Sequence, residues 1–376
     1  MSDEIVLIYF SAFPSTHALG PAITVDRLAT HLSRHAPVRI LTLNYDCSTR
    51  KPLFRDAHTI VKSGNVTTEY LPYDVRRFSR MYAVLRASQR ATALHCLFDY
   101  RMAIPALLIG TWARGRSARF LHFPHGIFLN AVYQQKHLKK LLFCFALETF
   151  GLSKKLTHVA SAPLEAEDIQ RCFRSRQKIV TLTHFGQPPI NHAGLALTGK
   201  KPCDLRICFA GRVVQQKNLL GALDILKQIR VPCTFDIIGS TDDEIYYSKC
   251  KDAVATLPQY VSVNFLGSLP RDELMERFPT YHALFFPTGG ENFGHAIIEA
   301  LANALPVLIS DRTPWSDVES RGAGWAFSLE FPERFVEVLE MLYRMGPEYS
   351  RSGAIKYAED TASPPGLEQA VLALFQ

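Results

Sequence analysis

Two glutamates in the second half of the chain, Glu291 and Glu299, have surroundings typical of a ligand site. They lie in "GGENFGHAIIEALANALPVLIS", where glycines precede a helix that we predict from His295 onward. Glu299 follows His295 by four residues and shares its helical face, while Glu291 lies in the preceding loop. Free N–H groups of a first helical turn can bind an anion, and carboxylates accept hydrogen bonds from sugar hydroxyls. The spacing alone more often marks an exposed acid and an ordinary helix glutamate.

Two cations follow an earlier predicted strand in the same half. In "GRVVQQKNLLGALDIL", Gly211 permits a tight exit from the strand, and Arg212 and Lys217 come just before a helix. Basic side chains beside a helix N-terminus suit a phosphate group. Two solvated bases beside a capped helix fit these residues equally well, and the P-loop pattern is absent. The acids of "TDDE", residues 241–244, are expected to cap a helix rather than to bind a metal.

The elements that position these residues alternate between short apolar runs and amphipathic stretches. Strands are predicted at 5–10, 38–43, 93–98, 119–123, 156–160, 178–182, 206–210, 234–238, 262–266, 283–286, 307–310 and 324–327. Helices are predicted at 23–35, 134–150, 218–229, 243–256 and 295–303, among others. This alternation indicates an α/β fold with parallel sheets covered by helices on both faces. Ligands of such sheets bind beyond the carboxyl ends of the strands, where the residues above lie.

The length of the chain, 376 residues, exceeds what one compact core holds and predicts two domains. Residues 184–204 are rich in glycine, proline and polar residues, and we interpret them as the linker. We therefore expect a first domain over 1–190 and a second over 191–364. A final short helix at 365–376 can pack back on the first domain.

Charge differs sharply between the two halves. Residues 1–190 carry a net charge of +13 and residues 191–376 one of −6, which together give the +7 of the chain. The basic half favours an anionic partner, such as a membrane surface or a phosphorylated substrate. The eight cysteines are scattered without a C-x-x-C pair, which fits a reducing cytoplasm and argues against a structural zinc site. Neither the N-terminus nor the apolar run 102–112 has the features of a signal peptide or a spanning helix.

Three stretches in order resemble the donor-binding half of one enzyme family. "GRVVQQKN", "VNFLGSLPRDEL" and "FFPTGGENFGHAIIEALANALPVLISDRTPW" are similar to the retaining glycosyltransferases of family four, also called glycosyltransferases group one. The resemblance is strong over 205–327 and weaker before it. It implies the GT-B fold, in which two Rossmann-like doubly wound domains face each other across a cleft. The first domain would then bind the acceptor and the second the nucleotide-sugar donor.

The resemblance also implies roles for individual residues. Arg212 and Lys217 match the pair that holds the donor diphosphate, and Glu291 matches the acid on the hydroxyls of the donor sugar. Glu299 matches the acid that binds the nucleotide ribose. The remaining donor-binding matches are Gly20, Gly211, the base-lining loop Leu266, Gly267, Ser268 and Leu269, and the helix start Asn292, Phe293, Gly294 and His295. The family implies no divalent metal and no cofactor, the nucleotide-sugar being a substrate.

His125 is the candidate from the first half. It stands in "PHGIF" after a predicted strand, where a neutral imidazole could orient or deprotonate an acceptor hydroxyl or bond the donor sugar. With thirteen histidines in the chain, an ordinary loop histidine is the alternative. The match to the "HG" of the family favours a functional role.

The sequence departs from the family pattern at three glycines. The loop after the first strand, "SAFPSTHALGPAI", retains only Gly20 of a double glycine, and His17 could fill part of that space. The "P-N-G" near the end of the first domain is "THFGQ" here, with Gly186 retained. Ala304 stands where the family usually has glycine, which we expect to alter only a helix end.

The stretch 134–155 is both basic and strongly apolar. With Arg76, Arg77, Arg80, Arg86 and Arg90 it accounts for much of the positive charge of the first half. It fits docking on anionic lipid at the inner face of the cytoplasmic membrane, and equally a core helix with solvated lysines. Nucleic acid is a weaker fit, because no recognised nucleic-acid-binding fold or aromatic platform accompanies the charge.

Together these features predict a retaining glycosyltransferase that moves a hexose from a nucleotide-sugar to a hydroxyl of a glycan or glycolipid acceptor. Assembly of a bacterial surface polysaccharide or lipopolysaccharide is the expected context. A nucleotide-sugar epimerase of GT-B fold and a nonenzymatic nucleotide-sugar-binding partner subunit remain alternatives. A nicotinamide dehydrogenase is disfavoured, since no G-x-G-x-x-G follows the first strand.

Overall fold

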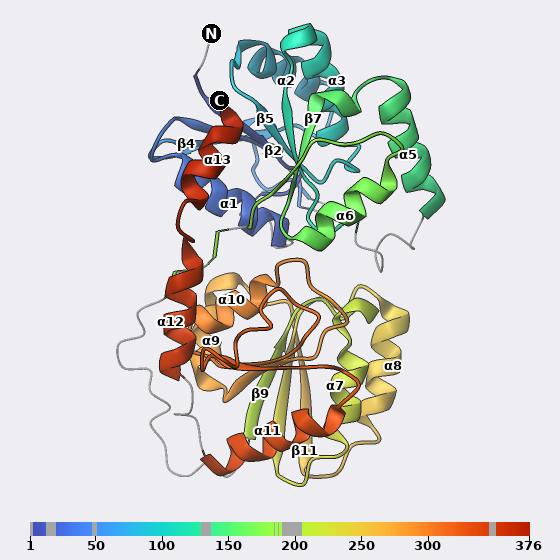
Figure 1. The fold of residues 1–376 in the computed structure, drawn as a ribbon, viewed down its shortest axis with the longest axis vertical. Helices are drawn as coiled ribbons and strands as arrows, with labels where there is room; N and C mark the ends of the chain where they lie inside the picture. Colours follow the sequence, from blue (N-terminus) through green and yellow to red (C-terminus); the bar gives the residue numbers. More distant parts are fainter. Residues whose placement is uncertain are drawn as a thin grey trace. The chain divides into compact units, whose positions relative to one another are not determined.

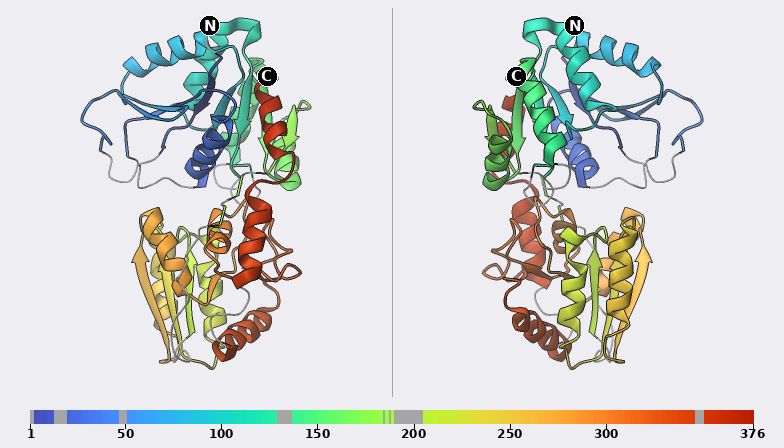
Figure 2. Two further views of the ribbon diagram at one scale, coloured as in Figure 1. Left: turned by 90° about the vertical axis from the view of Figure 1, so that its left-hand side faces the viewer. Right: turned by 90° about the vertical axis from the view of Figure 1, so that its right-hand side faces the viewer.

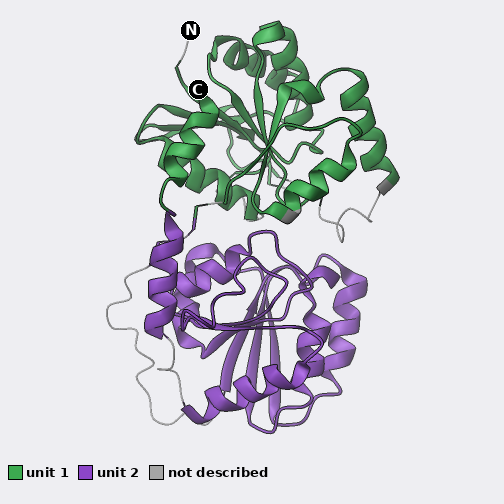
Figure 3. Cartoon of the chain, in the orientation of Figure 1, with its two compact units in different colours: residues 1–185, 365–376 green, residues 186–364 purple. Residues whose placement is uncertain are grey.

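The chain folds into two compact α/β units. The computed structural model describes residues 3–12, 20–46, 51–128, 137–183, 185–186, 188–189, 205–345 and 351–376. Unit 1 comprises residues 1–185 and 365–376, and unit 2 comprises 186–364 (Figures 1 and 3). The predicted linker and His17 lie largely or wholly outside the described residues.

Unit 1 is built on an eight-stranded sheet of order β3-β4-β2-β1-β5-β6-β7-β8. Neighbouring strands are parallel except for the antiparallel pair β3 and β4 at one edge. The central strands β1 and β5 are buried on both faces, as expected inside a parallel sheet, and β1 is an apolar run. The strands are β1 (Ile5–Ile8), β2 (Val38–Leu43), β3 (Thr59–Ser63), β4 (Val66–Leu71), β5 (Thr92–His95), β6 (Phe120–Phe123), β7 (Leu156–Ala160) and β8 (Ile179–Thr181).

Helices cover both faces of this sheet (Figure 2). They are α1 (Gly20–Leu32), α2 (Arg76–Ala87), α3 (Ala103–Arg114), α5 (His137–Thr149), α6 (Pro163–Cys172) and α13 (Leu367–Phe375). Leu367, Val371 and Phe375 of α13 recur every four residues and share a buried cluster with Leu28 and Leu32 of α1. The final helix therefore completes the core of unit 1.

The β3–β4 hairpin was missed by the sequence analysis, because neither strand has a clear apolar pattern. β3 is largely exposed, and β4 places a fully buried acid, Glu69, in the sheet. Arg39 and His58 bond that carboxylate at 2.8 and 2.7 Å, and Arg80 bonds it as well. Burial alone would raise the pKa of Glu69, but the bonds from Arg80, His58 and Arg39 outweigh it and hold the pKa below its usual value.

Two predicted strands of unit 1 extend too far. The strand predicted at 93–98 ends at His95, because Cys96 has φ 59° and accepts a turn bond from the Asp99 N–H at 2.8 Å. The strand predicted at 5–10 ends at Ile8. Shortened strands leave these residues in loops at the carboxyl edge of the sheet, where they can contact a ligand.

A pair of buried histidines links β6 and β7. His122 Nδ1 lies 2.9 Å from His158 Nδ1, and the Leu97 N–H donates to His122 Nε2 at 3.2 Å. His122 Nε2 is thus an acceptor, so the His122 proton is on Nδ1 and is donated to His158. Burial lowers the pKa of His158 to about 4, and burial and neighbouring histidine charges hold that of His122 well below 6.5. Both rings are neutral in the folded protein.

We expect unit 1 to lose stability as the pH falls through the unfolded-state pKa of these histidines. The unfolded chain binds protons at these histidines that the folded chain does not bind. Each ring therefore lowers the free energy of unfolding by about 1 kcal/mol as the pH falls from about 6.5 to about 5.5. Urea unfolding at several pH values measures this, and His158→Gln should flatten the dependence. Stability that is unchanged over this range would contradict the assignment.

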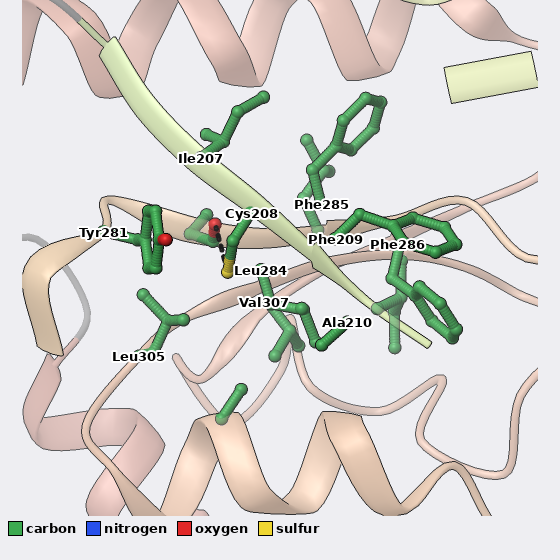
Figure 4. Close-up of a cluster of buried hydrophobic side chains, with 14 of the residues drawn as sticks. Ile207, Cys208, Phe209, Ala210, Tyr281, Leu284, Phe285, Phe286, Leu305 and Val307 are labelled. Atoms are coloured by element: carbon green, nitrogen blue, oxygen red, sulfur yellow. Dashed lines mark hydrogen bonds between the residues drawn. The ribbon is translucent and has the colours of Figure 1, made fainter. Parts of the chain in front are cut away.

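Unit 2 is built on a six-stranded, fully parallel sheet of order β11-β10-β9-β12-β13-β14. The order reverses between β9 and β12, which makes the gap beyond their carboxyl ends the expected ligand site. The sheet core is apolar, with Phe209, Phe285 and Phe286 clustered around β9 and β12 (Figure 4). The strands are β9 (Leu205–Ala210), β10 (Cys233–Ile238), β11 (Val261–Gly267), β12 (Ala283–Phe286), β13 (Val307–Ser310) and β14 (Gly324–Phe327).

The helices of unit 2 follow the sequence pattern closely. Asp243 caps α8 as predicted, its carboxylate accepting from the Tyr246 N–H at 3.1 Å. The helices are α7 (Leu219–Leu226), α8 (Glu244–Val254), α9 (Arg271–Arg277), α10 (His295–Ala302), α11 (Pro332–Met345) and α12 (Arg351–Ala362). In the part of the chain that the structure describes, none of the helices combines the length and apolar character needed to cross a bilayer.

Ala304 lies at the end of α10, as expected. The Ala304 N–H bonds Leu301 O at 3.0 Å and the Leu305 N–H bonds Ala300 O at 2.9 Å, the pattern of a Schellman motif. Ala304 has φ 58°, the left-handed conformation in which glycine is usual.

Replacing Ala304 by glycine is expected to stabilise unit 2 by about 0.5–1 kcal/mol, because glycine removes the Cβ strain of the left-handed conformation. Urea unfolding measures the effect. The matched control is Ala302→Gly inside the same helix, which should destabilise by about 1 kcal/mol or more. Shifts of the same sign for both variants would contradict this interpretation.

Candidate functional site

The loops that follow β9 and β12 are joined into one wall at the switch point of unit 2. The Gly289 N–H donates to Gln216 O at 2.9 Å, and Gln216 Nε2 donates to Gly290 O at 3.2 Å. Thr288 Oγ1 also donates to Gln216 O at 3.2 Å. The motif of Arg212 and Lys217 and the motif of Glu291, over seventy residues apart in sequence, are therefore linked directly by hydrogen bonds.

Lys217 and Glu291 form an ion pair within this wall. Lys217 Nζ lies 2.5 Å from Glu291 Oε1, with 19% and 7% of the two side chains exposed. Thr288 Oγ1 lies 3.2 Å from the same oxygen, which shares the single hydroxyl proton with Gln216 O, and Lys217 Nζ lies 5.6 Å from the centre of the Phe286 ring. The carboxylate and the ammonium are held in place without a ligand, which lowers the cost of ordering them when one binds.

Arg212 follows the carboxyl end of β9 and takes no part in this ion pair. Its side chain is exposed, and within the described residues it makes no hydrogen bond or ion pair. Gly211 precedes it at a crowded position, where its carbonyl oxygen lies 1.9 Å from the place of a Cβ on Gly239. The close approach of two glycine backbones brings the ends of β9 and β10 together and leaves the Arg212 guanidinium available to an anion.

Helix α10 begins at the rim of the wall. Gly294 precedes it with φ 76°, and a Cβ there would lie 2.9 Å from Ile297 Cδ1. The Phe293 carbonyl accepts from the Trp315 indole N–H, and the Phe293 ring packs on Trp315 and His295 at 5.1 and 4.8 Å. Trp315 thereby fixes the backbone that leads into the helix. Asn292 and His295 lie half-buried beside it.

Glu299 lies one turn into α10 and is only 4% exposed. Arg271, at the start of α9, bonds its Oε1 through Nε and Nη2, each at 3.1 Å. Strand β11 ends with Leu266 and with Gly267, which has φ 71°. The loop to α9 begins with the exposed Ser268, and Leu266 and Leu269 pack against the core. Arg271 therefore positions the carboxylate of Glu299 beside the β11–α9 loop.

His125 and Gly20 belong to unit 1. His125 has φ 55°, a strained conformation for a non-glycine residue, and its Nε2 lies 2.8 Å from His95 Nδ1. The Gly126 N–H donates at 2.7 Å to buried Glu165, which also accepts from Ser161. His125 thus stands in a tightly held turn at the carboxyl edge of the sheet.

Gly20 begins α1, and its carbonyl accepts from Thr24 Oγ1 at 3.2 Å. The loop before it, which carries the departure from the double glycine, lies outside the described residues. Among the described residues, no cluster of three or more His, Cys, Asp or Glu is arranged to hold a metal ion.

Four residues of these sites were missed by the sequence analysis: Thr288, Arg271, Trp315 and His95. Arg271 stands in the quoted "SLPRDEL" stretch and Thr288 directly before the glycines, so their place in motifs was a usable signal. His95 ends the strand next to that of His125, which only the strand order reveals.

The sequence of unit 2 matches a known family model. Residues 198–360 match the family described as glycosyl transferases group 1. Unit 2 is therefore a glycosyl transferases group 1 domain. The matched range lies within unit 2 and contains the two joined loops, the Lys217–Glu291 ion pair and Glu299.

Solved structures extend the similarity from unit 2 to the whole chain at the level of fold. Sucrose-phosphate synthase from Thermosynechococcus elongatus matches with a TM-score of 0.70 at 14% identity, over 99% of this chain and 98% of that one. Anabaena HepE, in complex with UDP-glucose, matches with a TM-score of 0.69 at 12% identity, over 98% of each chain.

A third structure, WaaG, a glycosyltransferase involved in lipopolysaccharide biosynthesis, matches with a TM-score of 0.62 at 12% identity, over 98% of this chain and 99% of that one. No curated protein sequence matches the chain. The fold of the chain is GT-B, with two parallel-sheet domains, as predicted.

Proposed function

We propose that the protein is a retaining, metal-independent hexosyltransferase that uses a nucleoside-diphosphate sugar as donor. The observation that carries the proposal is the Lys217–Glu291 ion pair, set at the switch point of a group 1 glycosyltransferase domain. One structural relative supports a UDP-sugar donor: HepE was crystallised with UDP-glucose and with UDP. The proposed contacts involve the diphosphate, the donor sugar and the ribose. They are the same for any nucleobase, so the base must be identified by experiment.

The proposed site supplies positive charge where the leaving group develops negative charge. Arg212 and Lys217 would contact the diphosphate, and the N-terminus of α10 would add its free N–H groups. Glu291, positioned by Lys217 and Thr288, would accept hydrogen bonds from the sugar hydroxyls. Glu299, positioned by Arg271, would accept them from the ribose.

The proposed reaction replaces one bond at the anomeric carbon on the same face of the sugar. The bond from that carbon to the diphosphate oxygen breaks, and a bond to the acceptor oxygen forms. The proton of the acceptor hydroxyl passes to the departing diphosphate. The strained, histidine-paired His125 is the residue of unit 1 that we assign to orienting the acceptor hydroxyl or the donor sugar.

The acceptor that we propose is a glycan or glycolipid of a bacterial surface polysaccharide or lipopolysaccharide. The net charge of +13 in residues 1–190 and the similarity to WaaG support it. The same charge supports peripheral contact of unit 1 with an anionic membrane from the cytoplasmic side.

A thermal-shift panel of UDP, GDP, ADP and their common sugar conjugates, run with and without a chelator, tests the donor site. A ligand that binds only the folded chain raises the melting temperature. We expect one nucleoside diphosphate to shift it with chelator present, and the anomeric configuration of the glycoside product to match that of the donor. Inversion, or loss of the shift with chelator, would contradict the proposal.

Two other outcomes would replace the proposal. Conversion of the donor sugar to its epimer without acceptor would identify an epimerase. Nucleotide binding without turnover on any acceptor, restored only by a second protein, would identify a partner subunit.

A further inference from the structure

An open hollow of about 690 Å³ lies in unit 1, and none of the residues of the candidate site lines it. Arg86, Arg114, Arg116 and Arg119 line it, with a glutamine, an alanine, Ser88 and Ser117 between them. The lining comes from the segments that enter β5 and β6, so it lies at the amino ends of these strands. His95 and His125 follow the carboxyl ends of the same two parallel strands, at the opposite edge of the sheet.

The four guanidinium groups are not neutralised by acids of the lining. No aspartate or glutamate is among the residues that form the hollow. Arg114 Nη1 is buried and makes no hydrogen bond, while Arg114 Nη2 donates only to a carbonyl, that of Ser117, at 3.3 Å. Arg116 makes no hydrogen bond or ion pair within the described chain. A buried donor without a partner costs free energy that an anion would recover.

Other arginines of unit 1 show what a purely structural role looks like. Arg90 is bonded to Asp3 at 2.8 and 2.9 Å, and Arg76 forms a forked pair with Asp74. In the hollow, Arg86 donates to the Tyr82 hydroxyl at 2.9 Å, and Arg119 donates at 2.7 Å to the main-chain oxygen of Gln376, the last residue of the given sequence. The lining thus concentrates arginines without acidic side chains, unlike the paired Arg90 and Arg76.

We propose that this hollow is a second anion site, which binds a phosphate-bearing group of two or more negative charges through Arg114 and Arg116. Guanidinium groups bind phosphate oxygens by paired N–H bonds, and a site of four favours a polyanion over a single carboxylate. The group can belong to a free phosphorylated metabolite or to a lipid headgroup, and binding there is independent of the donor site.

Binding of inorganic pyrophosphate, measured by titration calorimetry, tests the site. The full chain is used with Arg212→Gln and Lys217→Gln, so that the proposed donor site does not contribute. We expect saturable binding at one site, weakened about tenfold or more by Arg114→Gln or Arg116→Gln. Arg116 is exposed and bonded to nothing described, so its variant tests the site even if Arg114→Gln harms folding. Arg76→Gln is the matched surface control.

Co-sedimentation with phosphatidylglycerol vesicles, against phosphatidylcholine vesicles, distinguishes the two sources. Binding to the anionic vesicles but not to pyrophosphate, lost on Arg116→Gln and retained on Arg76→Gln, would assign a lipid headgroup. Binding to pyrophosphate with the same variant pattern would assign a free metabolite. Equal losses for Arg76→Gln and Arg116→Gln, or no binding of either probe, would overturn the proposal. A failed donor panel leaves this result unaffected, because the donor-site cations are already removed.

Discussion

Replacing Glu291 by glutamine is expected to lower kcat by about 10²- to 10³-fold, the usual effect of removing one pre-positioned electrostatic group from an active site. The amide keeps the volume of the side chain but loses the charge that holds Lys217 at 2.5 Å. The sugar hydroxyls would then lose a charged acceptor, while Lys217 keeps its charge for the diphosphate. The affinity for the nucleoside diphosphate alone should change by less than about threefold, because Glu291 is assigned to the sugar. Initial rates at saturating donor measure kcat, and titration with the nucleoside diphosphate measures affinity.

Glu244→Gln is the control for this prediction, since Glu244 is an exposed acid in the first turn of α8. This variant should leave kcat and the affinity for the nucleoside diphosphate unchanged. If Glu291→Gln retains full turnover, or if it weakens binding of the nucleoside diphosphate as much as it lowers kcat, the assignment to the donor sugar is wrong.

Replacing Glu299 by alanine is expected to have the opposite effect: it should weaken nucleotide binding and leave kcat nearly unchanged. Affinity for the nucleoside diphosphate should fall by about 10- to 100-fold, which corresponds to losing a hydrogen bond to a charged group in a buried position. The value of kcat at saturating donor should stay within about threefold, because the ribose is remote from the bond that breaks. Calorimetric titration with the nucleoside diphosphate, which has the ribose but lacks the donor hexose, isolates the contact between Glu299 and the ribose.

Arg271→Gln provides a companion variant, because Arg271 bonds Glu299 without being assigned to the ligand. A smaller loss of nucleotide affinity is expected from it, as Glu299 keeps its charge but loses its orientation. Small and equal effects of Glu291→Gln and Glu299→Ala would show that neither acid binds the donor.

Much of the fold could be predicted from sequence, because central parallel strands are short apolar runs such as those of β1 and β12. The β3–β4 edge could not, since a buried acid such as Glu69 is tolerated only through cations from elsewhere in the chain. The ends of strands were also misjudged where the backbone turns at Cys96 in a left-handed conformation that sequence does not reveal.

Candidate site residues could be proposed from motifs, but the contacts between them could not be predicted. Nothing in the sequence links Lys217 to Glu291, whose contact depends on β9 and β12 being neighbours in the sheet. The same holds for His95 and His125, which meet because β5 and β6 are adjacent. Contacts of this kind follow from strand order, which is a property of the whole domain.

The assignment of α13 to unit 1 has a consequence for synthesis of the protein. Unit 2 is inserted in the chain between residue 185 and residue 365 of unit 1. During translation, residues 186–364 leave the ribosome before the helix that covers α1 has been made, so unit 2 can fold while the core of unit 1 is still open. Chains that stop before residue 365 would therefore carry a complete unit 2 attached to an incomplete unit 1, whose exposed core favours aggregation.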